Sequence, residues 1–187
     1  MRWIPGCRRP ERENGAVRVD RWFAFVDLSG FTSFGDEHGD DESVRVLTVF
    51  RGAVRQVATD FGVRIAKWLG DGCMLVSVEP AQLVAAVCKL EELTRDLELP
   101  LQLHAGMAGG AVILLEGDDY TGRCVNLAAR LAGVAEPSEV LSTPDLARFA
   151  PYGTPVEPAG MISVAGLHDP VEVVRVGFAA ERARNGS

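Results

Sequence analysis

Three charged side chains stand at positions where a folded chain has little structural need for charge. Asp27 ends an otherwise apolar segment, and Lys67 and Asp71 flank the run Trp68-Leu69-Gly70. Paired carboxylates without histidine suit hard cations such as Mg²⁺ or Mn²⁺, and a lysine in apolar surroundings requires a partner for its ammonium group. Each aspartate also has an ordinary interpretation, Asp27 as a helix N-cap and Asp71 as a turn residue. For either residue alone, that interpretation is favoured.

A second polar group lies in a helix-like segment nearer the C-terminus. Asn126 and Arg130 are four residues apart, so they share one face of the helix expected over 122–134. Arginine binds phosphate through its forked guanidinium group, and asparagine can donate to an oxygen or accept from a hydroxyl group. Asp119 precedes this helix, where the helix dipole also favours an acidic residue. For the Asn126–Arg130 pair alone, an ordinary solvated face is the default.

The segment after Asp27 can bind an anion through its backbone. It contains Gly30 and leads into a helix, so its N–H groups suit a phosphate. Ser29 and Thr32 are better placed than Asp27 to cap that helix, which leaves Asp27 free for another role.

Periodicity of the apolar residues predicts alternating strands and helices. Gly-Asp-Gly at 70–72 predicts a tight hairpin turn, Gly62 a helix end, and Gly109-Gly110 a turn between two strands. The expected strands cover 21–27, 63–69, 73–78, 101–108, 111–115, 139–142, 155–164 and 171–177, and the expected helices cover 32–60 (split near 35–39), 80–97, 122–134 and a segment from 143.

This order is β-α-β-β-α-β with extra C-terminal strands, an α+β ferredoxin-like core in which helices pack on one face of an antiparallel sheet. The first strand and the hairpin are neighbours in that topology, so Asp27 and Asp71 are expected to converge at one end of the sheet. Lys67 is expected on the same strand face as Val63, Ile65 and Leu69.

Length and charge bound the function. The 187 residues are 47% hydrophobic, which predicts one buried core, and the net charge of −7 argues against a nucleic-acid partner. No run is long enough to span a membrane, and the four cysteines have no CxxC spacing, which predicts free thiols in a cytoplasmic protein. We expect a flexible N-terminal arm over 1–20, one domain over 21–178, and a disordered tail over 179–187.

Three motifs in register resemble the catalytic domain of the class III nucleotidyl cyclases, most closely a bacterial single-domain adenylate cyclase. They are Phe25–Thr32, Lys67–Asp71 and Gly122–Leu131, with a weaker match over 164–173. The similarity extends from about Trp22 to Gly177, nearly the whole expected domain.

The resemblance implies a role for each candidate residue. Two Mg²⁺ or Mn²⁺ ions would be held by Asp27, Asp71 and the Leu28 carbonyl, the base would be read by Lys67 and Asp119, other substrate contacts would come from Gly30, Phe31 and Thr32, and the transition state would be stabilised by Asn126 and Arg130.

The implied reaction converts ATP to 3′,5′-cyclic AMP and pyrophosphate. An ammonium group can donate to adenine N1, and a carboxylate can accept from the 6-amino group, whereas guanine presents the reverse pattern. Lys67 with Asp119 therefore favours ATP over GTP.

The resemblance also implies a head-to-tail homodimer with two shared sites. Asp27 and Asp71 would come from one chain, and Lys67, Asp119, Asn126 and Arg130 from the other. Two features depart from the family pattern: Ala165 stands where many relatives have a basic residue, and the connection between residues 110 and 122 is short. The alternatives are a nucleotide-binding regulatory module without turnover and a cyclase that uses GTP or has relaxed specificity.

Overall fold

The computed structural model describes residues 12–13, 16–115, 119–163 and 169–177. One sheet runs in the order β3-β4-β2-β5-β7-β9-β8, with β1 paired to β2 and β6 to β5. Its strands are β1 (Arg12–Glu13), β2 (Ala16–Leu28), β3 (Arg64–Leu69), β4 (Gly72–Ser77), β5 (Leu103–Leu114), β6 (Tyr120–Thr121), β7 (Val140–Ser142), β8 (Val156–Ile162) and β9 (Val171–Val176). Antiparallel pairing of β2 with both β4 and β5 confirms the ferredoxin-like core, and β7 to β9 extend it.

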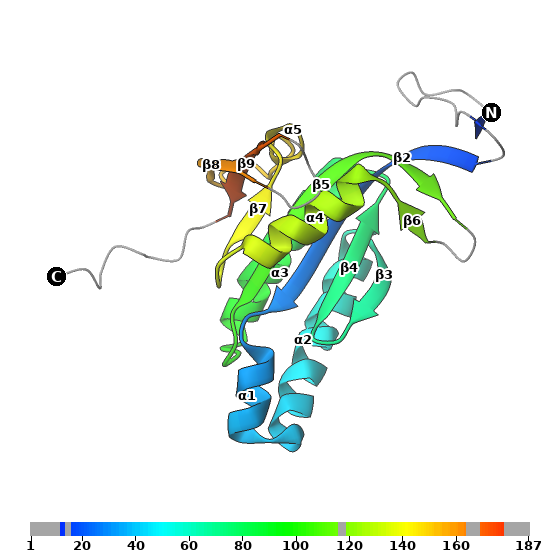
Figure 1. Cartoon of the computed structure of the whole chain (residues 1–187). Coiled ribbons are helices and arrows are strands. Elements are labelled where there is room, and N and C mark those ends of the chain that lie inside the picture. Colours follow the sequence, from blue (N-terminus) through cyan, green and yellow to red (C-terminus); the bar gives the residue numbers. More distant parts are fainter. Residues whose placement is uncertain (1–11, 14–15, 116–118, 164–168, 178–187) are drawn as a thin grey trace.

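Helices cover both faces of the sheet (Figure 1). They are α1 (Phe31–His38), α2 (Asp40–Asp60), α3 (Pro80–Asp96), α4 (Arg123–Val134) and α5 (Pro144–Ala147). Ala24, on one face of β2, packs in a cluster with α2 and α3, whereas Phe23, on the other face, packs in a cluster with α4. The prediction that all helices lie on one face is therefore wrong for α4. The reason is that both faces of β2 are apolar, so each must be covered.

Residues 103–114 form one continuous strand, so the turn predicted at Gly109-Gly110 is wrong. These glycines provide room for close packing. A Cβ at Gly109 would collide with the indole of Trp22, and a Cβ at Gly106 would collide with the backbone of α4 at Ala132. Glycine within a strand often marks a site of close approach.

The first strand of the core is longer than predicted. β2 begins at Ala16, and Val17 to Asp20 pair with Ala111 to Leu114. The predicted flexible arm is therefore wrong for residues 16–20, because their backbone groups are used in the β2–β5 ladder. Residues 1–11 and the predicted tail over 179–187 lie outside the described residues.

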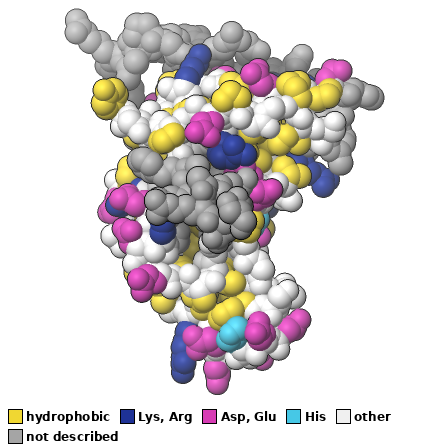
Figure 2. Space-filling view, turned by 90° about the vertical axis from the view of Figure 1, so that its left-hand side faces the viewer, with side chains coloured by type: hydrophobic (Ala, Val, Ile, Leu, Met, Phe, Trp, Pro, Cys, Tyr) yellow, Lys and Arg dark blue, Asp and Glu magenta, His cyan; other side chains and the backbone are white. Residues whose placement is uncertain are grey.

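The α1–α2 pair projects beyond the end of the sheet (Figure 1). Acidic side chains gather at this end, the lower end of Figure 2. Three of them, Asp40, Asp41 and Glu42, lie in the first turn of α2, where negative charge stabilises the helix dipole. None of the helices in the described ranges has the length and apolarity needed to cross a membrane.

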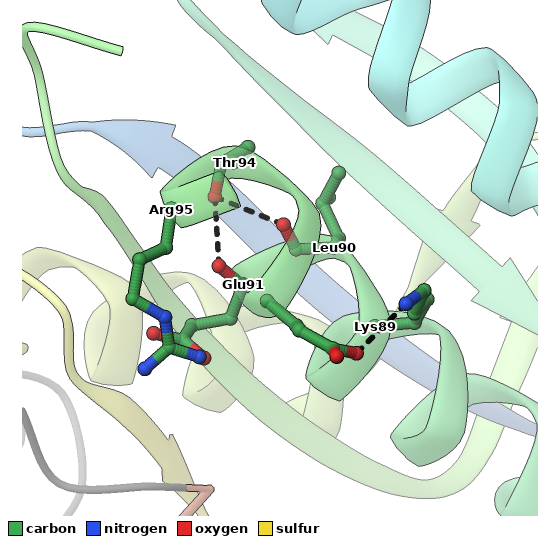
Figure 3. Close-up of polar contacts among 6 residues, drawn as sticks. Lys89, Leu90, Glu91, Thr94 and Arg95 are labelled. Atoms are coloured by element: carbon green, nitrogen blue, oxygen red, sulfur yellow. Dashed lines mark hydrogen bonds and ion pairs between the residues drawn. The ribbon is translucent and has the colours of Figure 1, made fainter. Parts of the chain in front are cut away.

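A polar network on α3 is internal to that helix (Figure 3). The carboxylate of Glu91 is largely buried and accepts a 3.0 Å hydrogen bond from Arg95, while the Thr94 hydroxyl donates to the Leu90 carbonyl at 2.9 Å. Burial raises the pKa of Glu91, and the charge of Arg95 opposes this rise. The Glu91–Arg95 pair thus keeps a buried carboxylate tolerable within the helix.

Candidate active site

Asp27 lies at the end of β2, next to the turn that joins β3 and β4. Its Oδ1 accepts a 3.1 Å hydrogen bond from the Leu28 N–H. A Cβ at Gly72 would lie 2.7 Å from the same oxygen, so a glycine is needed where β4 passes Asp27. Asp27 does not cap α1, because Gly30 is the N-cap residue of that helix.

The N-terminus of α1 has no side-chain cap. The prediction that Ser29 or Thr32 caps this helix is therefore wrong. Gly30 adopts a φ of 77°, a left-handed conformation that glycine reaches without strain. The first turn of α1, which includes Phe31 and Thr32, therefore keeps backbone N–H groups that no side chain caps.

Asp27 and Asp71 come close together across the end of the sheet. The pKa of Asp27 is raised, first by burial and then by the negative charge of Asp71 beside it. The part of this rise that Asp71 causes reflects repulsion between the two carboxylates. The two carboxylates are hard oxygen donors, and the Leu28 carbonyl, also predicted as a ligand, is of the same kind; this chemistry fits Mg²⁺ or Mn²⁺.

The same site has few protein ligands in total. Within the described ranges, no group of three or more His, Cys, Asp and Glu side chains could hold a metal ion. Mg²⁺ commonly binds through one or two carboxylates, with phosphate oxygens and water supplying its other ligands.

His104 lies beside Asp27 and is not among the predicted site residues. It is paired directly with Asp27 across the β2–β5 ladder, and its charge lowers the pKa of Asp27. His104 Nδ1 lies 2.9 Å from the Ala132 carbonyl of α4, so the ring links this helix to the strand beside Asp27. In the strand expected over 101–108, side chains alternate between the two faces of the sheet. This alternation could have placed His104 on the same face as its cross-strand neighbour Asp27.

Lys67 and Asp119 form an ion pair although 52 residues separate them in the chain. Lys67 Nζ lies 2.9 Å from Asp119 Oδ1, and the Tyr120 N–H donates to the same oxygen at 2.8 Å. The hydrogen bond from Lys67, followed by the one from Tyr120, lowers the pKa of Asp119. Both side chains are about half exposed, at 47% and 44%, so the pair is open to a ligand.

A β-bulge determines the face on which Lys67 lies. Ile65 pairs with Leu75, whereas Lys67 pairs with the next residue along β4, Met74, so the ladder shifts between these two pairs. Leu75 packs with α2 and α3, and Met74 packs with α4. Lys67 therefore lies on the α4 face, opposite Ile65, and the prediction that these two residues share a face is wrong. The extra residue of the bulge inverts the alternation.

Asn126 and Arg130 lie on the exposed side of α4. The opposite side of the helix, with Leu127, Ala128 and Leu131, is buried against the sheet. Among the described residues, neither the Asn126 nor the Arg130 side chain has a hydrogen-bond partner. The helix thus presents an amide and a guanidinium outward, on the sheet face that Lys67 also occupies.

The chain is related to several cyclases in sequence. It is 37% identical over 147 residues to an uncharacterized protein of Mycobacterium tuberculosis and 34% identical over 170 residues to a protein of the same organism named pH-sensitive adenylate cyclase. These matches cover 79% and 87% of the chain but only 38% and 42% of the two relatives. No protein-family model matches the chain.

The fold is that of solved cyclase domains. The adenylyl cyclase CyaB from P. aeruginosa superposes with a TM-score of 0.77 at 23% identity, covering 88% of this chain and 97% of that one. The guanylyl cyclase Cya2 superposes with a TM-score of 0.74 at 22% identity, covering 89% and 96%. The chain belongs to the class III nucleotidyl cyclase family. Two predicted departures from the pattern of this class III cyclase family concern Ala165 and the connection between residues 110 and 122. Ala165 and residues 116–118 of that connection lie outside the described residues.

Proposed function

We propose that this cyclase domain converts ATP to 3′,5′-cyclic AMP and pyrophosphate in sites shared by two copies of the chain. The observation that carries the proposal is the half-exposed Lys67–Asp119 ion pair, with 2.9 Å between Nζ and Oδ1. This ion pair supplies one hydrogen-bond donor and one acceptor side by side. Because both side chains are half exposed, the packing of the core does not require them. The cytoplasmic localisation expected from the sequence fits ATP as the substrate.

Adenine fits this pair in one orientation. Lys67 Nζ would donate to N1, and the carboxylate of Asp119 would accept from the 6-amino group. Asp119 is ionised and able to accept at neutral pH, and the hydrogen bonds from Lys67 and Tyr120, which lower its pKa, favour the same form. Guanine, with a 6-carbonyl and an N1–H, would place acceptor against acceptor and donor against donor.

The triphosphate of the same substrate would be held by the hairpin turn of the second copy of the chain. Asp27, Asp71 and the Leu28 carbonyl would bind the divalent ions, and the uncapped turn around Gly30, Phe31 and Thr32 would offer N–H groups to phosphate oxygens. The bound ions would supply acidification of the ribose 3′-hydroxyl and neutralisation of the phosphate charge. Burial, and then the negative charge of Asp71, raise the pKa of Asp27, and positive charge between the two carboxylates would offset the repulsion.

Asn126 and Arg130 would act on the reacting atoms. The ribose 3′-oxygen would attack the α-phosphorus as the bond to the bridging oxygen of pyrophosphate breaks, and the hydroxyl proton would pass to solvent water. Asn126 would orient the ribose for this in-line attack, and Arg130 would stabilise the charge that develops on the phosphoryl oxygens. Both side chains have no partner among the described residues of their own chain, which leaves them available to a substrate.

The shared site requires a second copy of the chain. Asp27 and Asp71 would serve one site of a head-to-tail homodimer, and the other four side chains the second site. On the exposed side of α4, Asn126 and Arg130 face away from their own sheet. They would therefore reach a substrate held by a partner that approaches this helix.

Product analysis tests the proposal. The purified protein is incubated with ATP or GTP, and with Mg²⁺ or Mn²⁺, and the nucleotides are separated by chromatography. We expect cyclic AMP and pyrophosphate in equal amounts from ATP, and little cyclic GMP. Cyclic GMP as the main product would refute the assignment of Lys67 and Asp119, and ATP binding without any product would indicate a regulatory module.

A further inference from the structure

A cluster on α2 contacts the hairpin that carries Lys67 and Asp71. Arg51 and Arg55, one helical turn apart, both lie over the indole ring of Trp68, with guanidinium carbons 5.1 and 5.3 Å from the ring centroid. Trp68 lies on the α2 face of β3, the face opposite Lys67. Two cations so close on one helix repel each other, and the π face of the indole offsets this repulsion.

Arg51 makes one contact that Arg55 does not. Its Nη2 donates a 2.9 Å hydrogen bond to the Gly70 carbonyl, in the turn immediately before Asp71. Gly70 has a φ of 73°, and the two-residue turn between Leu69 and Gly72 consists of Gly70 and Asp71 alone. Arg51 therefore bonds to the peptide unit that joins Gly70 to Asp71, whereas the Arg55 side chain, among the described residues, contacts the ring alone.

The position of Asp71 needs support from outside the hairpin. β3 is the edge strand of the sheet, so the turn has a ladder on one side only. A Cβ at Gly72, the residue after Asp71, would lie 2.7 Å from Asp27 Oδ1, so the turn packs directly against the Asp27 carboxylate and brings two like charges together. Arg51 Nε is buried and has no hydrogen-bond acceptor among the described residues. The orientation of the guanidinium therefore leaves one of its N–H groups unsatisfied.

We infer that Arg51 is a positioning residue for Asp71. By holding the Gly70 carbonyl from α2, with Trp68 as its platform, it keeps the turn where the Asp71 and Asp27 carboxylates can bind one cation. This inference rests on the proposed function, because it presumes that these aspartates bind the divalent ion. Arginine suits the role because a planar guanidinium can stack on a ring and donate in its own plane at once.

Mn²⁺ binding to the protein without nucleotide tests the inference, with free Mn²⁺ measured by electron paramagnetic resonance. Arg51→Met removes the bond to Gly70, and Arg55→Met is the matched control on the same ring. We expect Arg51→Met to weaken Mn²⁺ binding about tenfold or more, the usual effect of losing an outer-shell partner, and Arg55→Met to stay within about twofold of the unmodified protein. Arg51→Lys, which keeps the charge but not the fork, should fall between them.

Two results separate the possible failures. If Arg51→Met binds Mn²⁺ as tightly as Arg55→Met while Asp71→Asn loses binding, the inference is wrong and the metal site stands. If Asp71→Asn binds Mn²⁺ as well as the unmodified protein, the metal site of the proposed function is wrong, and the inference with it.

Hydrogen exchange provides a second readout should Arg51→Met fail to fold. The amides of residues 69–72 should exchange faster in Arg51→Lys than in the unmodified protein, with the centre of the β3–β4 ladder unchanged. Equal exchange of this turn in the two proteins would overturn the inference.

Discussion

Asp71→Asn is expected to reduce cyclic AMP formation by about 10³-fold, because the proposed site loses half of its charged metal ligands. The substitution keeps the size and shape of the side chain, so the turn has no steric reason to change. Steady-state rates with ATP and saturating Mn²⁺ measure this effect. Asp60→Asn, an exposed carboxylate at the end of α2, is the matched control and should leave the rate unchanged.

Asp71→Asn should lose activity without losing stability. Burial, and then the negative charge of Asp71, raise the pKa of Asp27, so removing the Asp71 charge relieves a repulsion in the folded state. Thermal unfolding without metal should therefore occur at the same or a higher temperature than in the unmodified protein. A large loss of both stability and activity would contradict the account, because it would make Asp71 a structural residue rather than a ligand.

Lys67→Met is expected to lower kcat/KM for ATP by about 100-fold and to reduce the preference for ATP over GTP. It removes the donor to adenine N1 and leaves Asp119 without its partner, a loss typical of one specific contact to a base edge. The matched control is Lys89→Met, which removes a lysine of similar exposure from an ion pair of 2.8 Å on α3. Exposed pairs contribute little to stability, so both variants should fold normally.

Exchanging the two charges sharpens this prediction. Lys67→Asp combined with Asp119→Lys keeps an ion pair but exchanges donor and acceptor, which matches the guanine edge. The ratio of ATP to GTP turnover should shift toward GTP. An unchanged ratio in both the single and the double variant would refute base recognition by this pair.

Local sequence patterns predict most elements of this fold because their periodicities are strong. Examples are the β3–β4 hairpin and the helical spacing of the apolar residues in α2 and α3. The order of these elements also predicts that Asp27 comes close to Asp71. The residues of β2 are apolar on both faces, and this pattern does not say what covers each face. The sequence alone was therefore compatible with helices on one face of the sheet or on both. The place of α4 therefore required the structure.

Other features depend on contacts between distant segments. The bulge before Lys67 arises from pairing with β4, and no local pattern marks it. Gly109-Gly110 has the signature of a turn, yet Gly109 is needed for the indole of Trp22. Arg51 is an ordinary helix-surface residue by spacing, and its role depends on where the hairpin turn comes to lie.

Mixing two inactive variants tests the shared site most directly. Asp71→Asn and Lys67→Met are co-expressed with different tags, and heterodimers are isolated through both tags. Lys67 and Asp71 are four positions apart on one hairpin, but in the proposed dimer they belong to different sites. Each heterodimer would therefore contain one intact site. We expect about half of the unmodified activity from these heterodimers. Heterodimers no more active than the single variants would contradict the account, because they would place Lys67 and Asp71 in the same site.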